Sequence, residues 1–156
     1  MYRVLVVEDE DIIRRGIMLS FDWTSIQCTI VGEARNGLEG VEKIQELSPD
    51  IVILDVNMPL MDGLEMIKST IEKYEYSAII LSGYSEFDYA KRAMKYGATE
   101  YLLKPLNREE MLEAVERAKK EREIKKAYLM KQNDREELKS IELLKEYDRY
   151  PKEDAV

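Results

Sequence analysis

The sequence predicts an α/β fold, a doubly wound five-stranded parallel sheet with helices on both faces. Short apolar runs alternate along the chain with stretches in which apolar residues recur every three or four positions. Such alternation is typical of strand–helix units that pair into a parallel sheet. We expect the strands at residues 4–7, 29–31, 51–54, 78–81 and 101–103.

Helices are expected between these runs, because apolar residues spaced by three or four positions line one face of a helix. Glycine is common just beyond a helix end, so Gly97 is expected to close the fourth helix. The positions that mark the helices are Ile13 and Ile17 for the first, Leu38, Val41 and Ile44 for the second, Leu64, Ile67, Ile71 and Tyr74 for the third, Phe87, Ala90, Ala93 and Met94 for the fourth, and Met111, Leu112, Val115 and Ala118 for the fifth.

A change in composition after the fifth helix begins predicts a domain boundary near residues 118–123. From Lys119 the apolar density falls and charged residues dominate. We therefore assign residues 1–120 to one domain and residues 121–156 to a helical extension.

Two helices are expected in the extended C-terminal part. The fifth helix should continue through Leu129, and Asp134 with Glu137 resembles a capping pair that opens a second helix ending at Pro151. No strict heptad persists, so a solvated linker helix and a dimerising helix stay open as alternatives. The apolar positions of the second helix are Leu138, Ile141, Leu144 and Tyr147.

Composition limits the function classes. The net charge is −8 with a pI near 4.8, which disfavours nonspecific binding of nucleic acid by this chain. Basic and acidic residues nearly balance in residues 107–156, so the acidity belongs to residues 1–106. No apolar run approaches the roughly 18 residues of a membrane span, and the first residues lead into a strand rather than a signal peptide. A cytoplasmic protein without membrane contact is expected.

Missing residue types exclude further chemistry. The chain has no histidine and a single cysteine, Cys28. Catalysis by Ser-His or Cys-His pairs is therefore excluded, zinc binding is disfavoured, and the protein cannot itself form phosphohistidine. An internal disulfide is impossible, and Cys28 is expected to be inert.

Polar side chains follow four of the predicted strands. Glu8 and Asp9 come after the first, Asp55 after the third, Ser82 after the fourth and Lys104 after the fifth. The carboxyl ends of parallel strands share one edge of the sheet, so these groups should meet in one crevice. Crowded carboxylates repel one another unless a cation joins them, and oxygen ligands suit Mg²⁺.

An Asp beside Mg²⁺ and a lysine is a plausible nucleophile toward phosphorus. The structural alternatives are that Asp9 or Asp11 caps the first helix, that Ser82 caps a turn, and that Lys104 is a surface residue. Four polar groups at four strand ends favour the site over these alternatives.

Three segments carry a resemblance to a known family. "VLVVEDE", "ILDVNMPLMDG" and "LSGYSEFDYAKRAMKYGATEYLLKP" resemble the receiver domain of bacterial two-component response regulators, the CheY-like family, over residues 2–120. The resemblance implies the strand order 2-1-3-4-5. It also implies a cis peptide bond between Lys104 and Pro105.

The resemblance also implies roles for the site residues. Asp55 would accept a phosphoryl group from a partner sensor histidine kinase. Ser82 would bind a phosphoryl oxygen, Lys104 would match the family's lysine, and Tyr101 would match its switching aromatic. The Mg²⁺ site would comprise Glu8, Asp9, Asp55 and Asn57, the last through its backbone carbonyl.

"FDWTSIQCTIVGEARNG" and "LSGYSEFDYAKRAMKYGATEYLLKPL" are similar to receivers joined to AraC-type DNA-binding domains, the YesN-like group. Trp23 has a structural alternative as a plug before the second strand, and Asn36-Gly37 has one as a turn. The function implied is a phosphorylation-dependent switch whose surface of fourth helix, fifth strand and fifth helix controls homodimerisation. DNA binding would need an output domain that this chain does not contain. A stand-alone receiver that acts by protein binding is the alternative.

Rival classes lack their defining residues. "GEARNGLE" has two glycines but no following Lys-Ser/Thr, so a nucleotide-binding Walker A loop is absent. A haloacid-dehalogenase-type phosphatase needs a second Asp where Asn57 stands. A purely protein-binding pseudo-receiver would lack part of the site. The chain is therefore expected to be a phosphoacceptor with at most weak autophosphatase activity, and not an enzyme.

Overall fold

The computed structural model describes residues 1–149, apart from the side chains of Tyr84 and residues 146–149. The chain divides into two compact units, Met1–Arg122 and Glu123–Val156. The helix end predicted at Pro151 lies outside the described residues. Among the helices that are described, none is long and apolar enough to cross a membrane.

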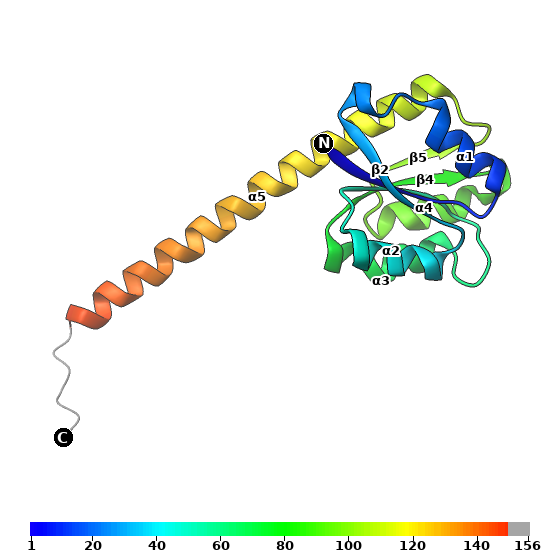
Figure 1. Ribbon diagram of the computed structural model, residues 1–156. Helices are drawn as coiled ribbons and strands as arrows, with labels where there is room; N and C mark the ends of the chain where they lie inside the picture. The colour runs from blue at the N-terminus through cyan, green and yellow to red at the C-terminus, as the bar shows by residue number, and fades with distance from the viewer. Residues whose placement is uncertain (150–156) are drawn as a thin grey trace. The chain divides into compact units, whose positions relative to one another are not determined.

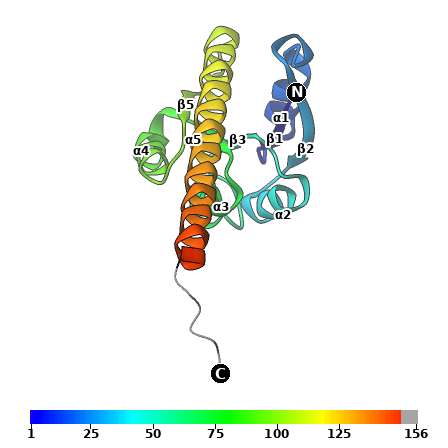
Figure 2. The ribbon, with the colours of Figure 1, turned by 90° about the vertical axis from the view of Figure 1, so that its left-hand side faces the viewer.

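The first unit is built on one parallel sheet of five strands, which confirms the predicted fold class. The strand order is β2-β1-β3-β4-β5, as the resemblance implied, and Figure 2 shows β5, β3, β1 and β2 in this sequence from left to right. The strands are β1 (Tyr2–Val7), β2 (Cys28–Ala34), β3 (Ile51–Asp55), β4 (Ser77–Ser82) and β5 (Glu100–Leu103).

Helices cover both faces of the sheet (Figure 1). In β3, Val52 and Leu54 face the core under α2, α3 and α4, whereas Ile51 and Ile53 face the core under α1 and the start of α5. Both faces of β3 are therefore buried, which explains its continuous apolar sequence. The helices are α1 (Asp11–Ser20), α2 (Gly37–Leu47), α3 (Gly63–Tyr74), α4 (Phe87–Lys95) and α5 (Arg108–Arg149), with short 3₁₀ turns η1 (Thr24–Ile26) and η2 (Tyr84–Glu86).

Side-chain caps fix the starts of α2 and α3, as Asn107 does for α5. Asn36 accepts a hydrogen bond from the backbone N–H of Glu39 at 2.9 Å, so this residue is the N-cap of α2. Asp62 caps α3 in the same way. Glu10 precedes α1 without a side-chain capping bond, so the alternative that Asp9 or Asp11 caps this helix is wrong.

Trp23 has the structural role proposed as its alternative. Its side chain is buried, and its indole Nε1–H donates a hydrogen bond to the backbone carbonyl of Ile17 at 3.1 Å. Its ring also lies 5.6 Å from that of Phe21. The ring thus seals the end of α1 before β2 begins.

The predicted break between two C-terminal helices is wrong. α5 is a single helix from Arg108 to Arg149, and Asp134 lies inside it. No glycine or proline occurs between these ends, and the surrounding Lys, Glu, Arg and Leu residues favour the helix. A capping pair opens a new helix only where the preceding backbone becomes extended, and here nothing interrupts the backbone.

Candidate functional site

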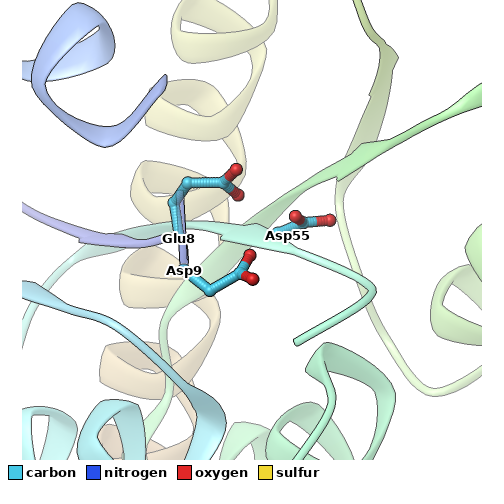
Figure 3. A group of neighbouring side chains, drawn as sticks. All are labelled: Glu8, Asp9 and Asp55. Atoms are coloured by element: carbon cyan, nitrogen blue, oxygen red, sulfur yellow. The ribbon is translucent and has the colours of Figure 1, made fainter. Parts of the chain in front are cut away.

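Three carboxylates meet at the carboxyl edge of the sheet. Glu8 and Asp9 follow β1, and Asp55 is the last residue of β3; each offers a carboxylate oxygen within 4.8 Å of the others. Figure 3 shows Glu8 and Asp9 with their carboxyl groups directed to the side on which Asp55 lies. Glu8 and Asp55 are buried, whereas Asp9 is exposed. The carboxylates at the ends of β1 and β3 therefore meet, as predicted from the strand ends.

Lys104 reaches into this cluster from the end of β5. Its Nζ donates hydrogen bonds to Oε1 of Glu8 and to Oδ2 of Asp55, each at 3.0 Å. Burial lowers the pKa of Lys104, but the hydrogen bonds to Asp55 and Glu8 raise this pKa more. The ammonium group thus stays charged, and the alternative of a surface lysine is wrong. The peptide bond between Lys104 and Pro105 is cis, as implied.

Glu8 shows how crowded the charges are. Its side chain is fully buried, and burial together with the adjacent Asp55 carboxylate raises the pKa of Glu8 to about 8, although Lys104 lowers it in part. Its Oε2 has no hydrogen-bond partner among the described residues. One ammonium group therefore does not balance the carboxylates of this cluster.

Arg14 binds the backbone of Glu8 and was missed by the sequence analysis. Its guanidinium is 2% exposed, donates to the backbone carbonyl of Glu8 at 2.9 Å, and pairs with Asp11. These bonds fix the backbone from which the carboxylate of Glu8 projects. The only signal in the sequence is a basic residue three positions before Ile17 on the buried face of α1.

Ser82 ends β4 beside Asp55 and is fully buried. Its backbone carbonyl accepts a hydrogen bond from the N–H of Lys104 at 2.9 Å. Its hydroxyl has no partner within the described part of the chain, so the alternative that this hydroxyl caps a turn is wrong. A buried hydroxyl without a partner is unusual, because burial of such a group costs free energy unless it is hydrogen-bonded.

The loop after β3 holds the Asp55 carboxylate from the other side. The backbone N–H of Asn57 donates to Oδ1 of Asp55 at 3.1 Å, and the Asn57 amide donates from Nδ2 to Oε1 of Glu86 at 3.3 Å. Gly63 starts α3 against this loop, where a Cβ atom would lie 2.4 Å from the Asp55 carbonyl oxygen. The Glu86 contact was missed, since it joins two loops that are far apart in the sequence.

Tyr101 lies outside the cluster. Its side chain is 39% exposed, and its ring packs edge-on against Phe87 with the centroids 6.1 Å apart. Of the seven residues predicted for the site, Tyr101 is thus the one that lies within a strand, β5, and away from the strand ends. The other six lie at the strand ends and in the adjoining loop.

These residues fit a divalent cation. The unpaired buried Oε2 of Glu8 and the close carboxylates of Asp9 and Asp55 form a hard, anionic oxygen set. Mg²⁺ prefers such ligands and retains waters in an open site. A cation here would relieve the repulsion that raises the pKa of Glu8.

Comparisons with known proteins agree with this geometry. The pattern of the response regulator receiver domain matches residues 4–116. Over 117 residues the chain is 46% identical to the uncharacterized transcriptional regulatory protein YesN of Bacillus subtilis, covering 74% of this chain and 32% of that protein. It is 40% identical to the transcriptional regulatory protein YdfI of Bacillus subtilis, covering 76% of this chain and 55% of that one.

A solved structure is similar over the same region. The REC domain of AraT, a response regulator from Geobacillus stearothermophilus, superimposes with a TM-score of 0.75 at 36% identity, covering 80% of this chain and 98% of that one. The matched region spans about a third of YesN and about half of YdfI.

Proposed function

This chain belongs to the response regulator receiver family, and we propose that it is a phosphorylation-dependent switch in which Asp55 accepts a phosphoryl group from a partner sensor histidine kinase. One observation carries this proposal. The buried Asp55 carboxylate lies between Lys104 at 3.0 Å and the loop of Asn57, while the nearby buried hydroxyl of Ser82 has no partner in the part of the chain that the structure describes. A phosphoryl group on Asp55 would supply the acceptor that Ser82 lacks.

The transfer makes one bond and breaks another. An Asp55 carboxylate oxygen would attack phosphorus, and the phosphorus–nitrogen bond to the kinase's histidine would break. The bonding electron pair would leave with the imidazole nitrogen. Lys104, already charged and bound to Asp55, would then pair with a phosphoryl oxygen as negative charge moves onto that group.

Metal binding supports the same step. We propose that Asp9, Asp55 and the backbone carbonyl of Asn57 hold Mg²⁺, with Glu8 beside them. The bound ion would supply positive charge opposite the phosphoryl oxygens. Glu8 and Asp9 would thus act as ligands or as support for the ion, and Asp55 would have the second role of nucleophile.

The switch would follow from a new hydrogen bond. When Ser82 turns toward a phosphoryl oxygen, the segment after β4 would move inward and leave space beside β5. Tyr101, now exposed against Phe87, would turn into that space. This bond exists only in the phosphorylated state, so it provides the differential contact that a shift of population requires.

The surface that would change is formed by α4, β5 and α5. Lys91, Arg92 and Lys95 are exposed on α4. Exposed acids lie on the first turns of α5, where Glu113 and Glu116 already pair with Arg117 and Lys119 at 4.0 and 2.8 Å. A two-fold axis would bring basic α4 against acidic α5 of a second copy. The acids of this surface are Glu109, Glu110, Glu113 and Glu116.

We propose that such dimers control a DNA-binding output in the cytoplasm. The support is that YesN and YdfI are named transcriptional regulators and that the chain spans only part of each. Residues 121–156 would then link the receiver of residues 1–120 to the output domain. A stand-alone receiver that binds another protein is the second candidate. Weak autophosphatase activity is part of the same proposal, as the resemblance to receivers implies.

Sedimentation velocity with and without beryllofluoride, a mimic of the phosphoryl group, tests the switch. Monomers should become dimers when the mimic and Mg²⁺ are present, and fluorine NMR reports that the mimic is bound. Arg92→Glu should weaken the dimer several-fold, since exposed ion pairs contribute about 0.2–1 kcal/mol each. Adding Glu109→Lys should restore it if the two charges face each other. A chain that stays monomeric with the mimic bound contradicts dimerisation and favours the second candidate.

A further inference from the structure

Glu86 connects the loops that follow β3 and β4. Its Oε2 accepts a hydrogen bond from the backbone N–H of Gly83 at 2.9 Å, and its Oε1 accepts one from Nδ2 of Asn57 at 3.3 Å. The Gly83 bond lies within the turn that opens η2 and is an ordinary capping contact. The Asn57 bond joins residues 29 positions apart and has no part in capping. It therefore needs another explanation.

The residues that Glu86 holds are neighbours of the two groups expected to act on a phosphoryl group. Gly83 directly follows Ser82, whose buried hydroxyl has no partner in the described part of the chain. The backbone N–H of Asn57 donates to Oδ1 of Asp55 at 3.1 Å. One carboxylate thus ties the backbone beside the hydroxyl to the residue that orients the acceptor.

We propose that Glu86 is a positioning residue that latches the loop after β4 to the loop after β3, and thereby slows phosphoryl uptake at Asp55. The inference rests on the proposed function. The latch favours the unphosphorylated arrangement of Ser82, so its removal shifts the population toward the arrangement that receives the phosphoryl group.

Initial rates of phosphorylation by acetyl phosphate and Mg²⁺, read by intact mass, test the latch in the full chain. Glu86→Ala should be about fivefold faster than wild type, as expected for the loss of one hydrogen bond that favours the unphosphorylated arrangement. Glu86→Gln, which keeps one acceptor but no charge, should fall between the two. Asp88→Asn is the matched control, since it removes an exposed charge two residues away and should leave the rate near that of wild type.

A gain in rate separates the latch from a merely structural role, because a damaged loop would slow the reaction. The Asn57→Ala background sharpens the test: it removes the Nδ2 donor but keeps the backbone, so Glu86→Ala should accelerate it less than twofold. The latch alone is overturned by either of two results. One is that Glu86→Ala is phosphorylated no faster than wild type; the other is that Glu86→Ala raises the rate equally in the wild-type and Asn57→Ala backgrounds. The proposed function and the latch are overturned together if wild type takes up no phosphoryl group, or if Asp55→Asn is labelled as fully as wild type.

Discussion

Strands β3 and β4 each have the same type of residue at both ends, an aspartate for β3 and a serine for β4, but the two residues of each pair have different hydrogen-bond partners. Ser77 begins β4 and Ser82 ends it, and both are fully buried. The hydroxyl of Ser77 donates to Oε1 of Glu121 at 3.2 Å, whereas that of Ser82 has no partner among the described residues. Likewise Asp50, directly before β3, accepts the backbone N–H of Arg3 at 2.8 Å, whereas Asp55 at its other end shares one lysine with Glu8.

The difference distinguishes the amino edge of the sheet from the carboxyl edge, where we propose the phosphorylation site. At the amino edge, Lys119 donates to the carbonyl of Ile26 at 2.9 Å and Arg3 donates to that of Leu47 at 2.7 Å. At the carboxyl edge, carboxylates crowd, and two buried oxygens beside them, in Glu8 and Ser82, have no partner among the described residues; the amino edge has one such oxygen, in Thr99, but no carboxylate cluster beside it. Buried polar groups are normally paired, so the carboxyl edge holds groups that a ligand would satisfy.

The largest expected effect is stabilisation by Mg²⁺ through the carboxyl edge alone. At a Mg²⁺ concentration about 100 times the dissociation constant, the free energy of unfolding should rise by about 2.7 kcal/mol relative to EDTA. Asp9→Ala should remove most of this increase, because it deletes one of the clustered carboxylates. Denaturant unfolding measures it, with Glu10→Ala as the control for an exposed neighbouring acid. Equal Mg²⁺ stabilisation of wild type and Asp9→Ala would argue against the site.

The same substitution should have opposite effects at the two ends of β3. In EDTA, Asp55→Asn should raise the free energy of unfolding by about 1 kcal/mol, since it removes one of the carboxylates that compete for Lys104. Asp50→Asn should lower it by about 1 kcal/mol, because a charge-assisted hydrogen bond is weakened. Thermal and denaturant unfolding of both variants give the comparison. A loss of stability in Asp55→Asn would show that this edge is as well paired as the amino edge.

The two serines of β4 offer the smallest and cleanest contrast. Ser77→Ala should lower the free energy of unfolding by about 1 kcal/mol, the typical net worth of one hydrogen bond. Ser82→Ala should raise it by about 0.5 kcal/mol in the unphosphorylated protein, since no hydrogen bond is lost and a buried hydroxyl without a partner is removed. Denaturant midpoints measured side by side decide the order. Equal losses would mean that the hydroxyl of Ser82 is satisfied in solution.

Much of the site was predictable because strand ends of a parallel sheet share one edge. The apolar run of residues 51–54 predicts β3, and its position predicts that Asp55, Ser82 and Lys104 meet. The roles assigned to them came from the resemblance and stay proposals. Long-range contacts gave no local signal: Arg14 reads as one more charge on a helix, and nothing near Glu86 points to Asn57.

The prediction of two C-terminal helices was wrong for a different reason. Asp134 with Glu137 has the spacing of a capping pair, but that pattern describes a helix start only where the chain first leaves a helix. Without a glycine or proline nearby, local propensity continued the helix through Asp134. A capping pattern flanked on both sides by helix-favouring residues is therefore weaker evidence for a helix start than one preceded by a glycine or proline.

Identification of the phosphoryl acceptor tests the central claim most directly. The chain would be incubated with acetyl phosphate and Mg²⁺, followed by intact mass and by peptide mapping of the labelled carboxylate. We predict one added phosphoryl group, located on Asp55, no labelling of Asp55→Asn, and full labelling of the amino-edge control Asp50→Asn. Undiminished labelling of Asp55→Asn, or a label mapped to another residue of the wild-type chain, would contradict the assignment of the carboxyl edge as the site of the switch.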